Sequence, residues 1–269
     1  MGYQRFVALG DSCTEGLHDR CPGSERYRGW ADLTAVALAA NEPEFRYANL
    51  GVRGRRLDQI IVEQLPTALD LQPDLVALFG GANDVMTRHF RPEVVAKRVD
   101  AAVRILSRAV PTVVVFTLSD VSGRMPGLLR VRPRLEALNE AIRAAAAAHG
   151  ARVVDLWAEE AGQDLRYFGP DRLHLSGPGH RRLAAHLLDR LDVPFDPEWL
   201  APLPGAPLTP GLGAHLGWVW REVLPVAVKR THNWLIGRSP GDGFTAKRPE
   251  LLPVLADELS QWTAIPGNL

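Results

Sequence analysis

The sequence has no excess of charge of either sign. Its 269 residues include 31 Lys and Arg and 31 Asp and Glu, so the formal net charge is zero. A chain without net charge has no long-range field that would concentrate polyanions. We therefore expect no nucleic-acid partner and no attraction to an anionic membrane surface.

Long apolar runs are also missing. No window approaches the roughly 20 apolar residues that a membrane-spanning helix needs. The first residues run directly into an apolar strand, without the charged segment, apolar stretch and cleavage site of a secretory signal. We expect no stable membrane insertion and a cytoplasmic location.

Cysteine is scarce, with Cys13 and Cys21 as the two in the chain. A disulfide across so short a loop is one reading, but two reduced thiols in a cytosolic protein is the one we favour. Cys13 lies beside a candidate nucleophile, yet nothing like a cysteine-protease signature surrounds it. We interpret it as a small packing residue.

Short apolar runs typical of buried strands alternate with stretches of helical spacing. The expected strands are residues 6–9, 46–49, 75–79, 112–118 and 152–156. The expected helices are residues 30–40, 57–71 with an interruption at Pro66, 92–109, 132–149 and 179–191. This alternation predicts a three-layer α/β domain around a parallel sheet.

The composition changes after Asp192. Residues 201–213 contain four Pro and three Gly, as a linker does, and five of the seven Trp lie in residues 199–269. We expect a catalytic domain over residues 1–195 and a Trp-rich helical extension over residues 196–269. Within the extension we expect a helix at 215–236, broken at Pro225, and a final docking helix within 249–262.

One face of the first extension helix is apolar. The residues that form it at helical spacing are Leu216, Val219, Trp220, Val223 and Leu224. Packing onto the catalytic domain is the interpretation we favour, because such a stripe is usually core. A homo-oligomer contact or a pocket lid is the alternative, and interfacial membrane binding comes last because Glu222 and a central Pro interrupt the face.

The first chemical motif is Gly10-Asp11-Ser12. A strand ends there, and a serine at the carboxyl edge of an open α/β sheet occupies the place where such folds bind ligands. A free backbone N–H at this turn can stabilise an oxyanion. The tripeptide alone is more often an ordinary turn or helix cap.

The second motif is Asp171-Arg172-Leu173-His174. A serine hydroxyl becomes a good nucleophile when a base takes its proton, and histidine is the side chain suited to that task. A carboxylate on the other ring nitrogen fixes the tautomer and stabilises the imidazolium. Alone, such a pair is usually a solvated Asp and a loop His.

Two further motifs follow predicted strands at the same sheet edge as Ser12. Gly51 can offer a backbone N–H, and Asn83, in Gly80-Gly81-Ala82-Asn83-Asp84, can offer its amide. Both are neutral donors suited to an oxyanion hole. Alone, each is more often an ordinary turn residue.

Together the four motifs resemble the blocks of the SGNH hydrolases, the GDSL-type esterases and lipases. They appear in the family's order, at Ser12, Gly51, 81–84 and 171–174, and the resemblance spans residues 5 to about 190. It implies a flavodoxin-like α/β/α sandwich with a five-stranded parallel sheet, and neither a metal nor an organic cofactor.

The resemblance also implies roles for individual residues. Ser12 attacks the carbonyl carbon, His174 is general base and then general acid, and Asp171 orients His174. Ser12 N–H, Gly51 N–H and the Asn83 side chain form the oxyanion hole. Asp11 and Asp84 brace their loops rather than take part in the chemistry.

The resemblance does not choose the substrate. We expect hydrolysis of carboxylic esters with small to medium acyl chains through an acyl-serine intermediate. An acyltransferase or a deacetylase of carbohydrates or natural products with the same triad is the alternative. A non-catalytic binding protein on the same fold is a third reading.

Four other polar residues lie near the motifs. We interpret His180 as a helix-start residue rather than as the base, and His89 as an exposed loop residue rather than part of the pocket. Glu15 and Arg53 follow two of the motifs and could contact substrate, but we favour a salt bridge in the loops.

Overall fold

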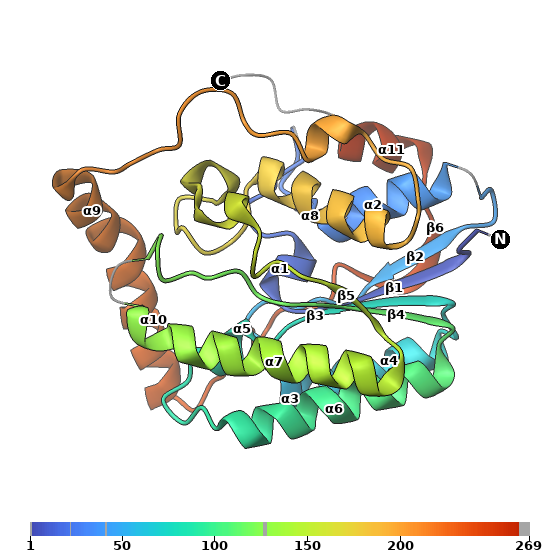
Figure 1. Ribbon diagram of the computed structural model, residues 1–269, viewed down its shortest axis with the longest axis horizontal. Helices are drawn as coiled ribbons and strands as arrows, with labels where there is room; N and C mark the ends of the chain where they lie inside the picture. The colour runs from blue at the N-terminus through green and yellow to red at the C-terminus, as the bar shows by residue number, and fades with distance from the viewer. Residues whose placement is uncertain (1, 22, 41, 126–127, 264–269) are drawn as a thin grey trace.

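A six-stranded sheet forms the centre of the computed structural model, which describes residues 2–21, 23–40, 42–125 and 128–263 (Figure 1). The strand order is β5-β4-β3-β1-β2-β6. The strands are β1 (Arg5–Gly10), β2 (Arg46–Asn49), β3 (Leu75–Phe79), β4 (Thr112–Phe116), β5 (Arg152–Val154) and β6 (Arg248–Pro253).

Strands β1 to β5 pair in parallel, and all five lie where the apolar runs predict them. Every residue of β3 is buried, as expected for a central strand covered on both faces. The order 2-1-3-4-5 within this part is that of the flavodoxin-like doubly wound fold. The predicted parallel core is therefore confirmed.

Helices cover both faces of the sheet and make the other two layers (Figure 1). On one face lie α2 (Trp30–Ala39), α8 (Gly177–Arg190) and α11 (Ala256–Thr263); on the other lie α4 (Leu65–Asp70), α6 (Pro92–Ala109) and α7 (Arg132–His149). Short helices α1 (Ser12–Glu15), α3 (Leu57–Gln59) and α5 (Ala82–Val85) follow strands or loops at the edge that carries the motifs. In the described ranges no helix has the length and apolarity needed to span a bilayer.

The sheet has six strands rather than the five expected, and the extension supplies the sixth. Strand β6 pairs antiparallel with β2, with Tyr47 opposite Leu252. Its sequence, Arg-Pro-Glu-Leu-Leu-Pro, contains two prolines, which lack a donor and are tolerated on an edge strand. The expectation of a wholly helical extension is therefore wrong over residues 248–253, and the final helix is the shorter α11.

The helical chain continues past both Pro66 and Pro225, where the sequence predicted interruptions. Pro66 and Pro225 each follow a five-residue π-helical segment, Ile60–Gln64 before α4 and Val219–Val223 before α10 (Leu224–Leu235). A π turn widens the helix, and this accommodates a residue without a backbone N–H. Helix α9 (Leu212–Trp218) thus runs on through the second π segment into α10.

The apolar stripe of the first extension helix is not core. Leu216 and Trp220 are 64% and 74% exposed, and Val219 and Leu224 are also exposed. Trp218, outside the stripe, is the residue of this segment that is buried. The interpretation that the stripe packs onto the rest of the chain is wrong, because the helix turns a different face inward.

Candidate active site

Ser12 and His174 meet at the carboxyl edge of the sheet. Ser12 is the first residue of α1, separated from the end of β1 by Asp11, and His174 lies on the loop that leads into α8. Ser12 Oγ is 2.8 Å from His174 Nε2, and His174 Nδ1 is 2.5 Å from Asp171 Oδ2. The structure therefore brings together the three residues that the sequence proposed as nucleophile, base and orienting carboxylate.

The loop from Asp171 to His174 folds around the carboxylate. The backbone N–H groups of Leu173 and His174 both donate to Asp171 Oδ1, at 3.0 and 3.1 Å. Burial alone would raise the pKa of Asp171, but the hydrogen bonds from His174 and His18 outweigh it and hold that pKa well below its usual range. Asp171 is thus ionised at any pH at which His174 acts as a base.

His18 is a second histidine on this carboxylate, and the sequence reading missed it. Its Nε2 lies 3.2 Å from Asp171 Oδ2, the same oxygen that His174 contacts. Nothing in its spacing from Ser12 marked it, because the contact depends on two loops that meet in space. Among the described residues, His18, Asp171 and His174 are also the His and carboxylate groups close enough to share a metal ion.

The expected oxyanion donors differ in what they contact. Gly51 is buried, and its N–H donates to Asn49 Oδ1 at 3.0 Å. The amide of Asn83, at the start of α5, donates to Asp11 Oδ2 and to the Arg55 carbonyl oxygen, both at 3.1 Å. Asn83 is partly exposed beside Asp11, the residue before Ser12, whereas the Gly51 N–H points into the fold.

Asp11 and Asp84 are engaged in loop contacts. Asp11 caps α1 by accepting the Cys13 N–H, and Asp84 accepts the Leu57 N–H and lies 3.5 Å from Arg98. Burial raises the pKa of Asp11 to about 6 and also raises that of Asp84. Both carboxylates therefore accept backbone N–H groups of nearby residues.

The neighbouring polar residues are also accounted for. His180 is fully buried; its Nδ1 accepts the Trp30 N–H, and burial lowers its pKa to about 4, so it is a neutral structural residue. Glu15 and Arg53 form an ion pair, as favoured from sequence. His89 is exposed. Cys13 and Cys21 are free thiols, and burial raises the pKa of both.

The extension reaches the catalytic loop through Arg172. The side chain of this buried residue lies 2.7 Å from His215 Nδ1, and its guanidinium lies over the Trp218 ring at 4.5 Å from the centroid. Arg124, itself buried, donates to the Arg172 carbonyl oxygen at 3.0 Å. The loop that carries Asp171 and His174 is therefore held on one side by α9.

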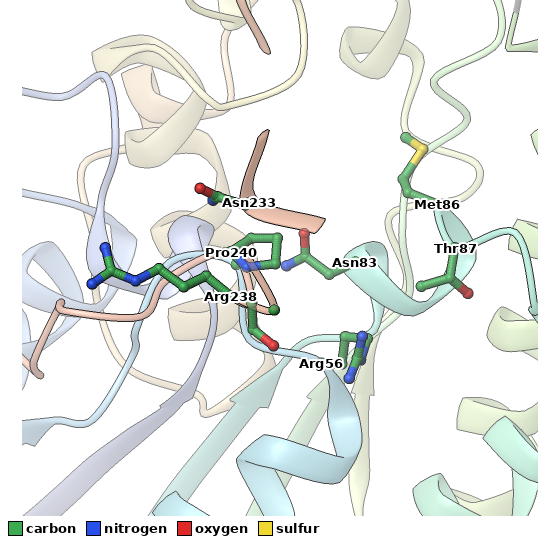
Figure 2. Close-up of a pocket in the computed structure, with 10 residues that line it drawn as sticks. Arg56, Asn83, Met86, Thr87, Asn233, Arg238 and Pro240 are labelled. Carbon is green, nitrogen blue, oxygen red and sulfur yellow. The ribbon is translucent and has the colours of Figure 1, made fainter. Parts of the chain in front are cut away.

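A cavity of about 510 Å³ opens beside Asn83 (Figure 2). Asn83, Met86 and Thr87 lie on one side of it, and Asn233, Arg238 and Pro240 from the extension lie on the other. Gly54 also lines it, with φ +79°, and a Cβ there would lie 2.6 Å from the Pro240 carbonyl carbon. Most side chains at this cavity can hydrogen-bond, and its walls come from both parts of the chain.

Comparison with known proteins identifies the family of the chain. A sequence model of the GDSL-like Lipase/Acylhydrolase family matches residues 8–182, so the chain belongs to that family. It is an esterase of the SGNH type, as the four motifs predicted. No curated protein sequence matches the chain.

Solved structures share the fold at low sequence identity. Axe2, an acetylxylan esterase from Geobacillus stearothermophilus, is 20% identical with a TM-score of 0.61, covering 74% of this chain and 97% of its own. The lipase/acylhydrolase from Enterococcus faecalis and LAE5, an α/β hydrolase from the metagenome of Lake Arreo, Spain, are each 24% identical with a TM-score of 0.58. Each of these two alignments covers 71% of this chain and 97% of the other.

Proposed function

We propose that the chain hydrolyses carboxylic esters of small to medium acyl chains through an acyl intermediate on Ser12. The observation that carries the proposal is the continuous hydrogen-bonded row from Ser12 Oγ through the His174 ring to Asp171 Oδ2. With Nδ1–H donated to the carboxylate, His174 Nε2 is left as an acceptor for the serine proton.

The reaction then follows two acyl-transfer steps. Ser12 Oγ attacks the ester carbonyl carbon while His174 takes its proton, and the protonated His174 then donates that proton to the departing alcohol. Water, deprotonated by His174, attacks the acyl-serine, and the protonated His174 returns that proton to Ser12 Oγ as the acid is released. Asp171 stays ionised throughout and stabilises the imidazolium in both steps.

For the oxyanion hole we propose the Ser12 N–H, the Asn83 amide and the N–H of Gly54 in place of Gly51. The Gly51 N–H already donates to a buried partner, Asn49 Oδ1. Gly54 lines the same cavity as Asn83 and lies on the loop that also carries Gly51. On binding an ester, Asn83 would exchange one of its two present acceptors for the carbonyl oxygen.

Hydrolysis of p-nitrophenyl acetate and butyrate by the Ser12→Ala variant tests the proposal. We expect loss of activity with the thermal transition preserved, and activity of the wild type that falls in acid as His174 takes up a proton. Cys13→Ser is the matched control, because it alters the adjacent nucleophilic group and should leave hydrolysis largely intact. Retained hydrolysis by Ser12→Ala would overturn the assignment.

A deacetylase of hydroxylated substrates is the second candidate. The cavity beside Asn83 is lined by Asn233, Thr87 and Ser239 in addition to Asn83, which suit a polar alcohol portion better than a long acyl chain. A series of esters that includes acetylated sugars and thioesters, with added alcohols as acceptors, separates hydrolysis from acyl transfer. Failure of a fluorophosphonate probe to label Ser12 would favour a binding protein instead.

We propose a division into a catalytic domain, residues 1–195, and an extension that completes the cavity and the sheet edge. A cytoplasmic location is consistent with the two free thiols, and no nucleic-acid partner is expected. A homo-oligomer through the exposed stripe around Trp220 stays a prediction, which sedimentation of the wild type and Trp220→Glu would test.

A further inference from the structure

His18 contacts the carboxylate of the proposed triad at the same oxygen that His174 contacts. Its Nε2 lies 3.2 Å from Asp171 Oδ2, and its ring centroid lies 5.5 Å from that of His174. Two imidazoles therefore share one carboxylate oxygen. A positive charge on either ring therefore changes the free energy of protonating the other ring.

Two backbone features make room for this imidazole. His18 has φ +68°, in the left-handed region that costs a residue with a Cβ some conformational energy. Gly169, two residues before Asp171, lies so close that a Cβ there would be 2.7 Å from His18 Cγ. The positive φ of His18 and the absence of a Cβ at Gly169 together allow the His18 ring to lie against Asp171.

The titratable and charged groups around His18 come from three segments. Asp171 and His174 face it from the catalytic loop, Glu222 from the extension, and Arg20 from its own loop. The hydrogen bond to Asp171 raises the pKa of His18; burial and Arg20 oppose this, and the negative charges of Asp171 and Glu222 add to it. The side chain is 36% exposed, which leaves it open to proton exchange with solvent.

We propose that His18 is a positioning residue that holds Asp171 Oδ2 in place for His174 and, once protonated, opposes protonation of His174. The proposal rests on the proposed function of Ser12, Asp171 and His174. The hydrogen bond to Asp171 and the negative charges of Asp171 and Glu222 favour a proton on His18. The positive charge of protonated His18, and its hydrogen bond to the shared Asp171 Oδ2, then keep His174 neutral, and able to act as a base, to lower pH.

Without a cation at position 18, Asp171 stabilises protonated His174 unopposed, so the acid limb of kcat/KM moves to higher pH. In the wild type, the ring centroids of His18 and His174 lie 5.5 Å apart, so a positive charge on His18 disfavours a second one on His174. We expect the acid limb to move by roughly half a pH unit or more when that charge is removed. Loss of the hydrogen bond itself should lower kcat by about 10-fold, with KM little changed.

Two variants separate the charge from the hydrogen bond. His18→Gln keeps an N–H donor near Asp171 but cannot become charged, so kcat at neutral pH should remain near wild type while the acid limb moves upward. His18→Gly removes the donor and the charge and also relieves the backbone at φ +68°, so the thermal transition should be kept or raised while kcat falls. His89→Gln, the same change at an exposed loop histidine, is the matched control.

The test is the pH profile of kcat/KM for p-nitrophenyl acetate between pH 4.5 and 8 for the wild type and these three variants, with Ser12→Ala measured alongside. An upward movement of the acid limb in both His18 variants, absent in His89→Gln, is the expected result. Acid limbs that coincide with wild type, or that move downward, would overturn the role of His18 while an inactive Ser12→Ala leaves the triad standing. An active Ser12→Ala would instead overturn the proposed function itself.

Discussion

The guanidinium of Arg172 lies over the indole ring of Trp218, with its carbon 4.5 Å from the ring centroid. Arg172 belongs to the catalytic loop between Asp171 and His174, and Trp218 is the last residue of α9 in the extension. A segment that follows the family-like part of the chain therefore packs directly on the loop that carries the proposed base. The extension therefore supports the loop that carries Asp171 and His174.

Trp218→Ala is expected to destabilise the protein by about 2–4 kcal/mol, because it removes a large buried aromatic side chain and leaves Arg172 without its stacked partner. The free energy of unfolding in urea measures the loss. Trp220→Ala, two residues on and 74% exposed, should change it by no more than about 0.5 kcal/mol. Equal effects of the two substitutions would contradict the packing described for α9.

Asn83→Ala is expected to lower kcat by about 10²–10³-fold with KM little changed, because an oxyanion donor acts mainly on the transition state. Steady-state kinetics with p-nitrophenyl butyrate separate the two parameters. A variant with raised KM and unchanged kcat would place Asn83 in substrate binding alone. Circular dichroism should show an intact fold, since the residue is partly exposed.

Glu159 gives a pH dependence of stability away from the active site. The hydrogen bond from His186, with those from Arg182 and the Ala161 N–H, outweighs burial and lowers the pKa of Glu159 to about 2. An unfolded glutamate titrates near pH 4.3, so the stabilisation is complete above that pH and is lost as the pH falls toward 2.

Glu159→Gln should therefore cost about 1 kcal/mol of unfolding free energy at pH 7, and the difference from wild type should shrink below about pH 4. Urea unfolding at pH 7, 5 and 3 measures it. Glu160→Gln, the neighbouring exposed carboxylate, is the control and should show no such trend. A difference for Glu159→Gln that is constant with pH would contradict the assignment.

The sequence alone could predict which residues lie at the carboxyl edge of the sheet. Ser12, Gly51 and Asn83 each follow a parallel strand, and the carboxyl ends of parallel strands share one edge, so their proximity follows from the pattern. Asp171 and His174 lie on one short loop, and a local motif was enough to pair them. The five parallel strands and the longer helices of residues 5–190 followed from apolar spacing.

The rest depends on contacts between distant segments. Strand β6, with two prolines, is a strand because the open edge of β2 pairs with it, which no property of Arg248–Pro253 alone predicts. His18 reaches Asp171 only because Gly169 leaves room across the loop interface. The Gly51 N–H was expected at the oxyanion, but the side chain of Asn49 turns back to accept it.

The central claim is that Ser12 forms the acyl intermediate. Rapid acid quenching of the enzyme with p-nitrophenyl butyrate, followed by mass spectrometry of the peptide that contains Ser12 and Cys13, tests it most directly. We expect one butyryl group on Ser12, present in Cys13→Ser and absent in Ser12→Ala. A butyryl group on Cys13, or turnover by Ser12→Ala without any acylated peptide, would contradict it.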